Sequence, residues 1–281
     1  MELAGEALLE KKLYKFRSIA RDSTQPERPD SSKLHYVERI FLANELYFPS
    51  PIELNDPLES RPNLVVGNLN DSRYKQQYVD YVKHLILETN PNAKQEDIEH
   101  WLANQTQNEA EGLAKENTEL YRSHLEKYRI CSFCATATNP LVWSHYADSH
   151  KGFCLVFDAD NEIFGGALKV HYQEDYPILD VTEQDDIEIL RHSALVKYTD
   201  WKYEQEYRLV SMEPNEPEAL PVKSKKFVFP PDMLSAVIFG CRISKPDTEL
   251  IVEWCQQRGG NVQLKQAVLS DTKYDLTIID L

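Results

Sequence analysis

The sequence lacks a long apolar run and a secretion signal. The longest apolar run near its end, residues 234–239, is far too short to cross a bilayer, which takes about 20 residues. The first residues, MELAGEALLEKK, are acidic and have neither the basic start nor the apolar stretch of a signal peptide. The five cysteines, an odd number at irregular positions, indicate reduced thiols. We therefore expect a cytoplasmic protein with no membrane partner.

Basic residues are scarce compared with acidic ones. The chain has 31 Lys and Arg against 46 Asp and Glu, which gives a net charge of −15. Such a charge repels polyanions, so it disfavours loose binding to nucleic acid or to an acidic membrane surface. The net charge does not exclude binding of nucleic acid at one localised site.

Several enzyme motifs are also absent. The sequence has no Walker loop, no GxGxxG and no GxSxG, which disfavours a nucleotide kinase, a Rossmann dehydrogenase and an α/β-hydrolase. Cys131 and Cys134 form a CxxC, but no second pair follows at zinc-site spacing. His145 and His150 are five apart, which is not the i, i+4 spacing of a helical metal site. We expect no metal.

The apolar pattern predicts an α+β fold. A chain of 281 residues with 42% hydrophobic residues can bury a large core. Short strand candidates outnumber long helices and come in runs, which favours a mostly antiparallel sheet, continuous or split, with flanking helices. These candidates are residues 13–17, 46–48, 130–134, 153–157, 168–172, 222–229 and 236–239, together with the end of the segment 197–210. Residues 262–268 and 274–279 are expected to close as a hairpin.

Residues 68–128 predict a helical insertion within a single domain spanning residues 1–281. Tyr74, Tyr78 and Tyr81 recur at helical spacing, and Asn90-Pro91-Asn92 interrupts the pattern. A tyrosine stripe of this kind is more typical of a core face than of a ligand site.

Chemically capable residues concentrate in residues 129–158. Two apolar, β-prone runs bracket a polar loop that contains Trp143, His145, Tyr146 and His150. His145 follows a predicted helix start at Asn139-Pro140, and either a site role or a structural polar network suits it. We expect the functional site here.

Two glutamates stand close together later in the chain. Glu204 and Glu206 are two apart, so on an extended strand both carboxylates face the same side. Two such charges raise each other's pKa unless a cation lies near. The pair is either an edge paired with a basic neighbour or a carboxylate placed to stabilise a cationic transition state.

Two further segments are candidates for ligand contacts. Arg17 ends the first strand candidate, and its planar fork suits phosphate or carboxylate. The segment Asn55-Asp56-Pro57 predicts a turn, because Asx side chains bond the following backbone and Pro57 restricts the residue before it. This turn is either structural or part of a pocket.

Five motifs occur in one order along almost the whole chain, apart from the helical insertion. They are residues 13–17 (LYKFR), 46–51 (LYFPSP) with 55–59 (NDPLE), 143–152 (WSHYADSHKG), 201–208 (WKYEQEYR) and 238–242 (IFGCR). On these motifs the sequence is identified as a member of the bacterial DUF2971 family. The name of that family records that its function is not generally established.

A weaker resemblance links the chain to ADP-ribosyltransferases, which have an arginine at the end of a first strand and a glutamate that starts a late strand. The resemblance implies NAD as co-substrate. The Ser-Thr-Ser strand of the arginine-type transferases is missing from this sequence, and residues 131–134 (CSFC) are its nearest counterpart. In such enzymes a fixed carboxylate stabilises the charge that builds on the ribose as nicotinamide leaves. The implied cofactor-binding residues are Arg17, Trp143, Tyr146, Asn55 and Asp56, and the implied catalytic residues are Glu206, Glu204 and His145.

Three functions follow as hypotheses. The first is an ADP-ribosyltransferase-like or NAD glycohydrolase-like enzyme, a phage-defence or toxin-type effector whose acceptor is a protein or a nucleic acid. The second is a non-catalytic module that binds a ligand or partner in the same pocket. The third is a metal-independent nuclease that uses His145, against which the net charge argues. The first requires that Arg17, His145 and Glu206 share one cleft around a nucleotide.

Overall fold

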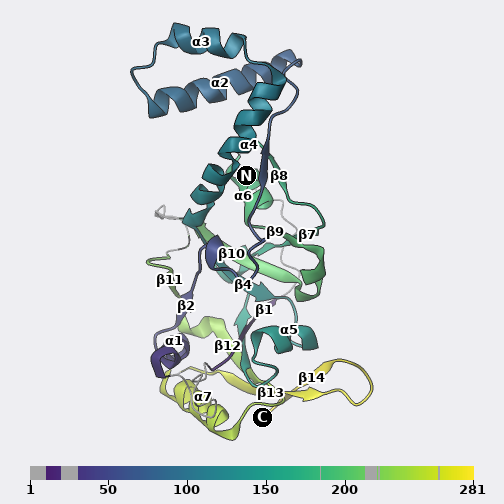
Figure 1. Cartoon of the computed structure of the whole chain (residues 1–281). Helices are drawn as coiled ribbons and strands as arrows, with labels where there is room; N and C mark the ends of the chain where they lie inside the picture. The colour runs from purple at the N-terminus through teal and green to yellow at the C-terminus, as the bar shows by residue number, and fades with distance from the viewer. Residues whose placement is uncertain (1–10, 20–30, 184, 213–219, 221, 259) are drawn as a thin grey trace. The chain divides into compact units, whose positions relative to one another are not determined.

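The computed structural model describes residues 11–19, 31–183, 185–212, 220, 222–258 and 260–281 (Figure 1). The chain folds as two compact units. Unit 1 consists of residues 1–55, 127–172 and 197–281, and unit 2 of residues 56–126 and 173–196. No helix among the described residues is long and apolar enough to span a membrane.

Unit 1 is built on a mostly antiparallel sheet, which confirms the predicted α+β fold. Within the described residues, eight strands pair in the order β14-β13-β12-β5-β1-β4-β10-β6, and only β12 and β13 run parallel. The strands are β1 (Lys12–Arg17), β4 (Tyr128–Cys134), β5 (Phe153–Asp158), β6 (Leu168–Lys169), β10 (Glu206–Met212), β12 (Leu234–Phe239), β13 (Gln263–Leu269) and β14 (Leu276–Asp280).

The sheet opens between β1 and β4. The two strands share the register pair Tyr14 with Cys134 and then part, whereas β1 pairs with β5 along its whole length. Where β1 and β4 part, the Lys15 side chain replaces a backbone donor, because its Nζ donates to the carbonyl oxygen of Ser132 at 2.8 Å. The eight strands nevertheless form one sheet, in which β1 and β4 remain neighbours.

Two apolar cores form on the two faces of the sheet, because alternate side chains of a strand point to opposite faces. On one face Leu13 packs with α1 (Ser31–Leu42) and α7 (Lys245–Arg258), where Phe41 stacks on Trp254. On the other face Phe16 meets Trp143 of α5 (Pro140–Tyr146) edge-on, with ring centroids 5.0 Å apart. α5 thus lies on the side of the sheet opposite to α1 and α7.

The remaining strand pairs and the 3-10 helices are short. β2 (Glu45–Tyr47) pairs with β11 (Lys226–Val228), and β7 (His171–Gln173) pairs with β9 (Val196–Tyr198). The 3-10 helices are η1 (Pro51–Glu53), η2 (Leu125–Lys127), η3 (Phe164–Gly166), η4 (Thr199–Glu204) and η5 (Pro231–Met233).

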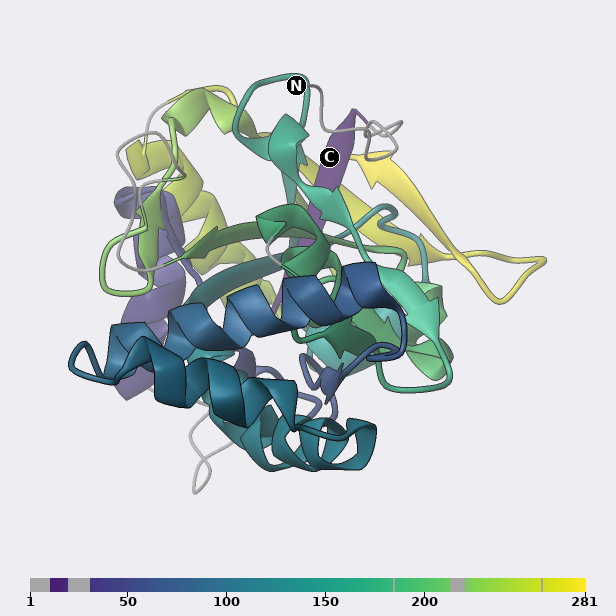
Figure 2. The ribbon, with the colours of Figure 1, turned by 90° about the horizontal axis from the view of Figure 1, so that it is seen from above.

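Unit 2 contains the helices predicted for residues 68–128. They are α2 (Ser72–Thr89), α3 (Gln95–Ala103) and α4 (Gln107–His124), and Figure 2 shows α2 and α3 side by side. Tyr78 is buried with Ile98 and Leu102, as a core stripe requires. The unit also includes α6 (Asp186–Ser193) and the parallel pair β3 (Asn63–Val65) and β8 (Ile178–Asp180). That pairing brings residues 173–196 into unit 2, which the predicted limits of the insertion leave out.

Candidate functional site

Glu204 and Glu206 lie on either side of a tight turn. Glu204 ends η4, Gln205 takes the left-handed conformation with φ 47°, and Glu206 begins β10. The predicted extended geometry is therefore wrong at Glu204, because the chain turns at Gln205. The carboxylates nevertheless converge, since both reach the same lysine.

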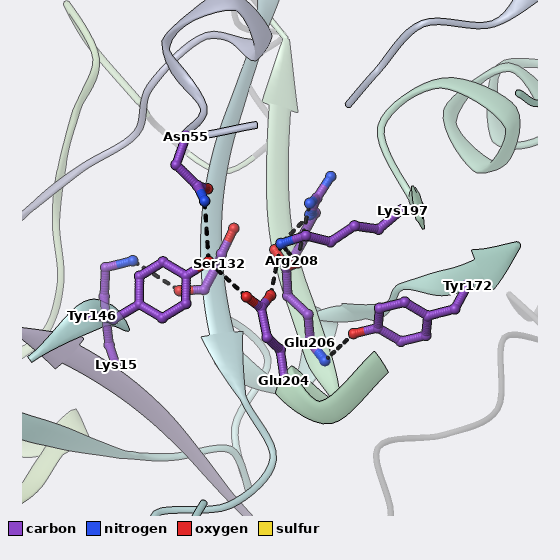
Figure 3. A network of polar contacts seen from close by, with 9 residues as sticks. All are labelled: Lys15, Asn55, Ser132, Tyr146, Tyr172, Lys197, Glu204, Glu206 and Arg208. Atoms are coloured by element: carbon purple, nitrogen blue, oxygen red, sulfur yellow. Dashed lines mark hydrogen bonds and ion pairs between the residues drawn. The ribbon is translucent and has the colours of Figure 1, made fainter. Parts of the chain in front are cut away.

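That lysine is Lys197 of β9. Its Nζ lies 2.6 Å from Oε2 of Glu204 and 3.1 Å from Oε2 of Glu206 (Figure 3). Arg208 of β10 adds a second cation, with its Nε 2.7 Å from Oε1 of Glu206. All four residues are at most 4% exposed. Two positive and two negative charges thus neutralise each other inside the protein, which a buried ionic group requires.

The two carboxyl groups differ in their affinity for protons. Burial opposes the charge of Glu206, but the charges of Arg208 and Lys197 outweigh it and lower the pKa of Glu206 to about 2. A hydrogen bond with the Ser132 side chain acts in the same direction. Burial raises the pKa of Glu204, and the neighbouring Glu206 adds to this effect against the attraction of Lys197. Glu206 is therefore the fixed anion, and Glu204 is the group that more readily takes up a proton.

Tyrosine hydroxyls extend this network. The hydroxyl of Tyr146 donates to Oε1 of Glu204 at 2.6 Å and accepts from Nδ2 of Asn55 at 3.2 Å. Burial raises the pKa of Tyr146, so its phenol stays a donor. The hydroxyl of Tyr172 accepts from the backbone N–H of Glu206 at 2.8 Å. Tyr146, which is partly exposed, carries the network from the buried carboxylates towards solvent.

Three aromatic side chains form a cluster beside the network. The ring centroids of His145, Trp201 and Tyr203 are 6.1 to 6.2 Å apart in all three pairs. His145 is exposed and the other two rings are partly exposed. The Nζ of Lys197 lies 4.9 Å from the centroid of the Trp201 ring, which joins this ring cluster to the charge network.

One asparagine fixes the ring cluster to α5. Oδ1 of Asn139 accepts from the N–H groups of Leu141 and Val142, which begins α5 where the Asn-Pro pair predicted a helix start. Nδ2 of the same side chain donates to the carbonyl oxygen of Tyr203 at 2.9 Å. The helix that carries His145 and the turn that carries Tyr203 are therefore held in one arrangement.

Trp143 takes a different place from the one predicted. It is fully buried, and its indole N–H donates to the carbonyl oxygen of Ala137 at 2.6 Å. Neither its polar atom nor a ring face is left for a ligand, so Trp143 is a core residue rather than a cofactor contact. The partly exposed tryptophan beside His145 is Trp201 instead.

Arg17 does not share a site with Glu206. On β1 it follows Leu13 and Lys15 on the face of α1 and α7, whereas Glu206 pairs with Cys134, whose side chain packs in the core below α5. Strand alternation thus sends the guanidinium and the carboxylate to opposite faces. The expectation that Arg17, His145 and Glu206 line one cleft is therefore wrong for Arg17.

The predicted turn at residues 55–59 divides between two roles. Asn55 bonds the hydroxyl of Tyr146, as described above. Asp56 is buried and its Oδ1 accepts from the N–H of Leu58 at 2.9 Å, which is the Asx interaction expected of a turn. Asn55 thus belongs to the network, and Asp56 shapes the turn.

Lys197 and Tyr172 are the members that sequence reasoning missed. Lys197 stands in the apolar run 194–198 (ALVKY), and a lone lysine in a buried strand signals a buried counter-charge. Arg208 gives the same signal between Tyr207 and Leu209. Tyr172 gives no such signal, because its partner is a backbone group.

No group of three or more His, Cys, Asp or Glu side chains among the described residues is placed to hold a metal ion. Residues 142–209 match the family model DUF2971, described as a protein of unknown function, which confirms that resemblance over the stretch from α5 to β10. No curated protein and no solved structure matches the chain.

Proposed function

We propose that this protein, whose residues 142–209 match the DUF2971 family model, is a ligand-binding module that holds the flat ring of a nucleotide against the ring cluster, with NAD as the first candidate. The carrying observation is that His145, Trp201 and Tyr203 present three accessible rings on a rigid support. Aromatic side chains bind flat heterocycles by stacking, at about 1–3 kcal/mol for each base.

The buried charges support binding better than catalysis by Glu206. A catalytic carboxylate must come within hydrogen-bond distance of its substrate. Glu206 is 3% exposed, and both its oxygens are occupied by Arg208 and Lys197. Glu206 instead acts as a structural support, because its ion pairs join β9 and β10 next to η4. This support orients Trp201 and Tyr203, and a binding site needs such rigid surroundings.

Titration with NAD tests this function. We expect saturable binding to the wild type, followed by calorimetry, and binding weaker by roughly tenfold or more in Trp201→Ala. Trp101→Ala is the matched control, because Trp101 is an exposed tryptophan on α3 of unit 2. The proposal fails if the wild type does not bind NAD, or if Trp201→Ala binds it as tightly as the wild type.

A second candidate function is the cleavage of NAD, and the bond between Tyr146 and Glu204 favours it. In this reaction the bond between nicotinamide and C1′ of the ribose breaks, and its electron pair goes to nicotinamide. The oxygen of water, or of a protein or nucleic-acid acceptor, bonds to C1′. Its proton can pass along Tyr146 to Glu204, whose raised pKa makes it the better acceptor of the two glutamates.

Chromatographic detection of free nicotinamide tests this second candidate. We expect release by the wild type, and a loss of release with unchanged NAD binding in Tyr146→Phe, which removes only the hydroxyl. A Glu206→Ala variant is less informative, because it leaves Lys197 and Arg208 buried without their shared anion. No release by the wild type with water, protein or RNA as acceptor leaves the binding module as the function.

A further inference from the structure

Unit 2 carries most of the negative charge of the chain. Its two segments, residues 56–126 and 173–196, contain 20 Asp and Glu against 8 Lys and Arg, which gives a net charge of −12. Unit 1 contains 26 acidic and 23 basic residues and so carries only −3. The negative potential of unit 2 attracts cationic partners and repels nucleic acid and a second copy of the same unit.

A hollow of about 750 Å³ lies on unit 2 and shares no residue with the ring cluster. It lies where the end of α3 meets the first turns of α4, and its lining includes Trp101 of α3 and Leu113 of α4. No lysine or arginine lines it in the described part of the unit. The hollow is therefore an accessible site in the region of strongest negative charge.

The apolar part of this site is open to solvent. Trp101 is 45% exposed and Leu113 is partly exposed. Gly112 leaves space between them and the solvent, because a Cβ atom there would meet nothing within 4 Å. Leu120 is 59% exposed and stands seven residues after Leu113, which places both on one face of α4. Trp101, Leu113 and Leu120 form what we call the apolar groove.

Free carboxylates border the apolar groove. Glu109 and Glu116 line the hollow, and both are exposed. Glu116 has no ion pair within the described residues, and Glu109 uses only its Oε2, which accepts from Thr106. Asp97 is exposed one helical turn before Trp101, on the same face of α3. The groove thus combines an apolar stripe with carboxylates that can each pair with a cation.

We propose that the apolar groove binds a basic amphipathic helix of a partner protein. Apolar side chains of that helix pack against Trp101, Leu113 and Leu120, and its lysines or arginines pair with the bordering carboxylates. The stretch of α4 from Glu109 to Leu120 is about 16 Å long, which matches three turns of a bound helix. An amphipathic helix is the partner that presents apolar residues at this spacing with charges beside them.

Anisotropy titration with a labelled peptide tests the site. The probe is an amidated helical peptide of about 16 residues made of lysine, alanine and leucine, with its leucines on one face. We expect the wild type to bind it at low ionic strength, and to bind it about tenfold more weakly when alanine replaces the leucines. A peptide with glutamate in place of lysine does not bind, and added salt weakens binding of the basic peptide.

Three variants locate the peptide on unit 2. Trp101→Ala removes the main apolar contact and Glu116→Lys reverses a bordering charge, so each should weaken binding by about tenfold. Gly112→Phe fills the hollow and should abolish binding. It keeps the fold, because the position has open space and glycine is a poor helix residue.

Two substitutions in unit 1 are the matched controls. Tyr274→Ala removes an exposed aromatic ring, and Glu162→Lys reverses an exposed charge. Both should bind the peptide as the wild type does, and circular dichroism checks that every variant is folded.

The proposal is overturned if the wild type does not bind the basic peptide, or if Trp101→Ala and Gly112→Phe bind it as tightly as the wild type. The second result would show that the peptide is attracted to the acidic surface without using the groove. Self-association of the wild type that Trp101→Ala abolishes, measured by light scattering, would assign the groove to a second copy of the chain and would also overturn the proposal.

Discussion

The Nζ atom of Lys197 lies 2.6 Å from Oε2 of Glu204, and the two side chains are only 3% and 4% exposed. This ion pair connects β9 to the end of η4 inside unit 1. With Arg208 and Glu206 it forms a charge network without net charge, and the ring cluster rests on it.

Replacing Lys197 by methionine should destabilise the protein strongly. Two carboxylates would then lie buried with one cation of the network, Arg208, in place of two, at a cost of about 3–5 kcal/mol in the free energy of unfolding. Lys12→Met is the control, because Lys12 pairs with Asp158 on the surface and such pairs contribute about 1 kcal/mol or less. Urea unfolding measures both. Similar losses for the two variants would contradict the role of Lys197.

The two glutamates should act on the pH dependence of stability in opposite directions. The folded state lowers the pKa of Glu206 from an ordinary 4.5 to about 2, so its contribution is present above pH 4.5 and is lost as the pH falls towards 2. This contribution is roughly 3 kcal/mol. The folded state raises the pKa of Glu204, so the folded protein binds the extra proton and loses stability as the pH rises above 4.5.

Glu206→Gln should therefore flatten the rise of stability with pH below 4.5, and Glu204→Gln should flatten the fall above it. Urea unfolding at a series of pH values measures the slopes. Equal slope changes in the two variants would show that the two carboxyl groups are not differentiated as the structure indicates.

The tryptophans Trp143 and Trp201 should separate stability from binding. Trp143→Phe loses a buried hydrogen bond and core volume, which costs about 2–4 kcal/mol of stability, and NAD binding to the folded protein remains. Trp201→Ala should lower the melting temperature less and weaken NAD binding. Thermal unfolding and NAD titration of both variants check this. If Trp143→Phe kept its stability but lost NAD binding, Trp143 would instead be part of the binding site.

Two glycine-to-alanine substitutions should change stability with opposite signs. A Cβ atom on Gly152 would lie 2.1 Å from the backbone oxygen of Arg17, and overpacking of this kind costs about 3 kcal/mol. Gly112 lies inside α4 with open space around its Cβ position, so Gly112→Ala should stabilise by about 0.5–1 kcal/mol. Chemical unfolding of both variants measures the difference. A Gly152→Ala variant as stable as the wild type would contradict the close contact between Gly152 and the backbone of Arg17.

The sequence allowed the fold class and the neighbourhood of the site to be predicted. An alternating pattern predicted β1, and short apolar, β-prone runs predicted β4, β5 and β12, because both local propensity and burial act on these strands. Strand pairings between segments that lie far apart in the sequence could not be predicted. The pairing of β3 with β8 joins residues more than a hundred positions apart, and no local pattern records it.

The sequence predicted which residues belong to the candidate site better than it predicted what each of them does there. Glu204, Glu206, Tyr146 and Asn55 belong to one network, as a cluster of capable residues suggested. The face to which Arg17 points depends on the register of a strand, and a shift of one residue reverses it. Whether Trp143 or Trp201 is exposed depends on how α5 packs on the sheet, which the sequence leaves open.

Calorimetric titration of NAD into the wild type and Trp201→Ala tests the central claim most directly. The account predicts saturable binding to the wild type and a loss of about tenfold or more in affinity in the variant, with the fold retained. Equal affinities for NAD in the two proteins, or no binding of NAD to the wild type, would contradict it.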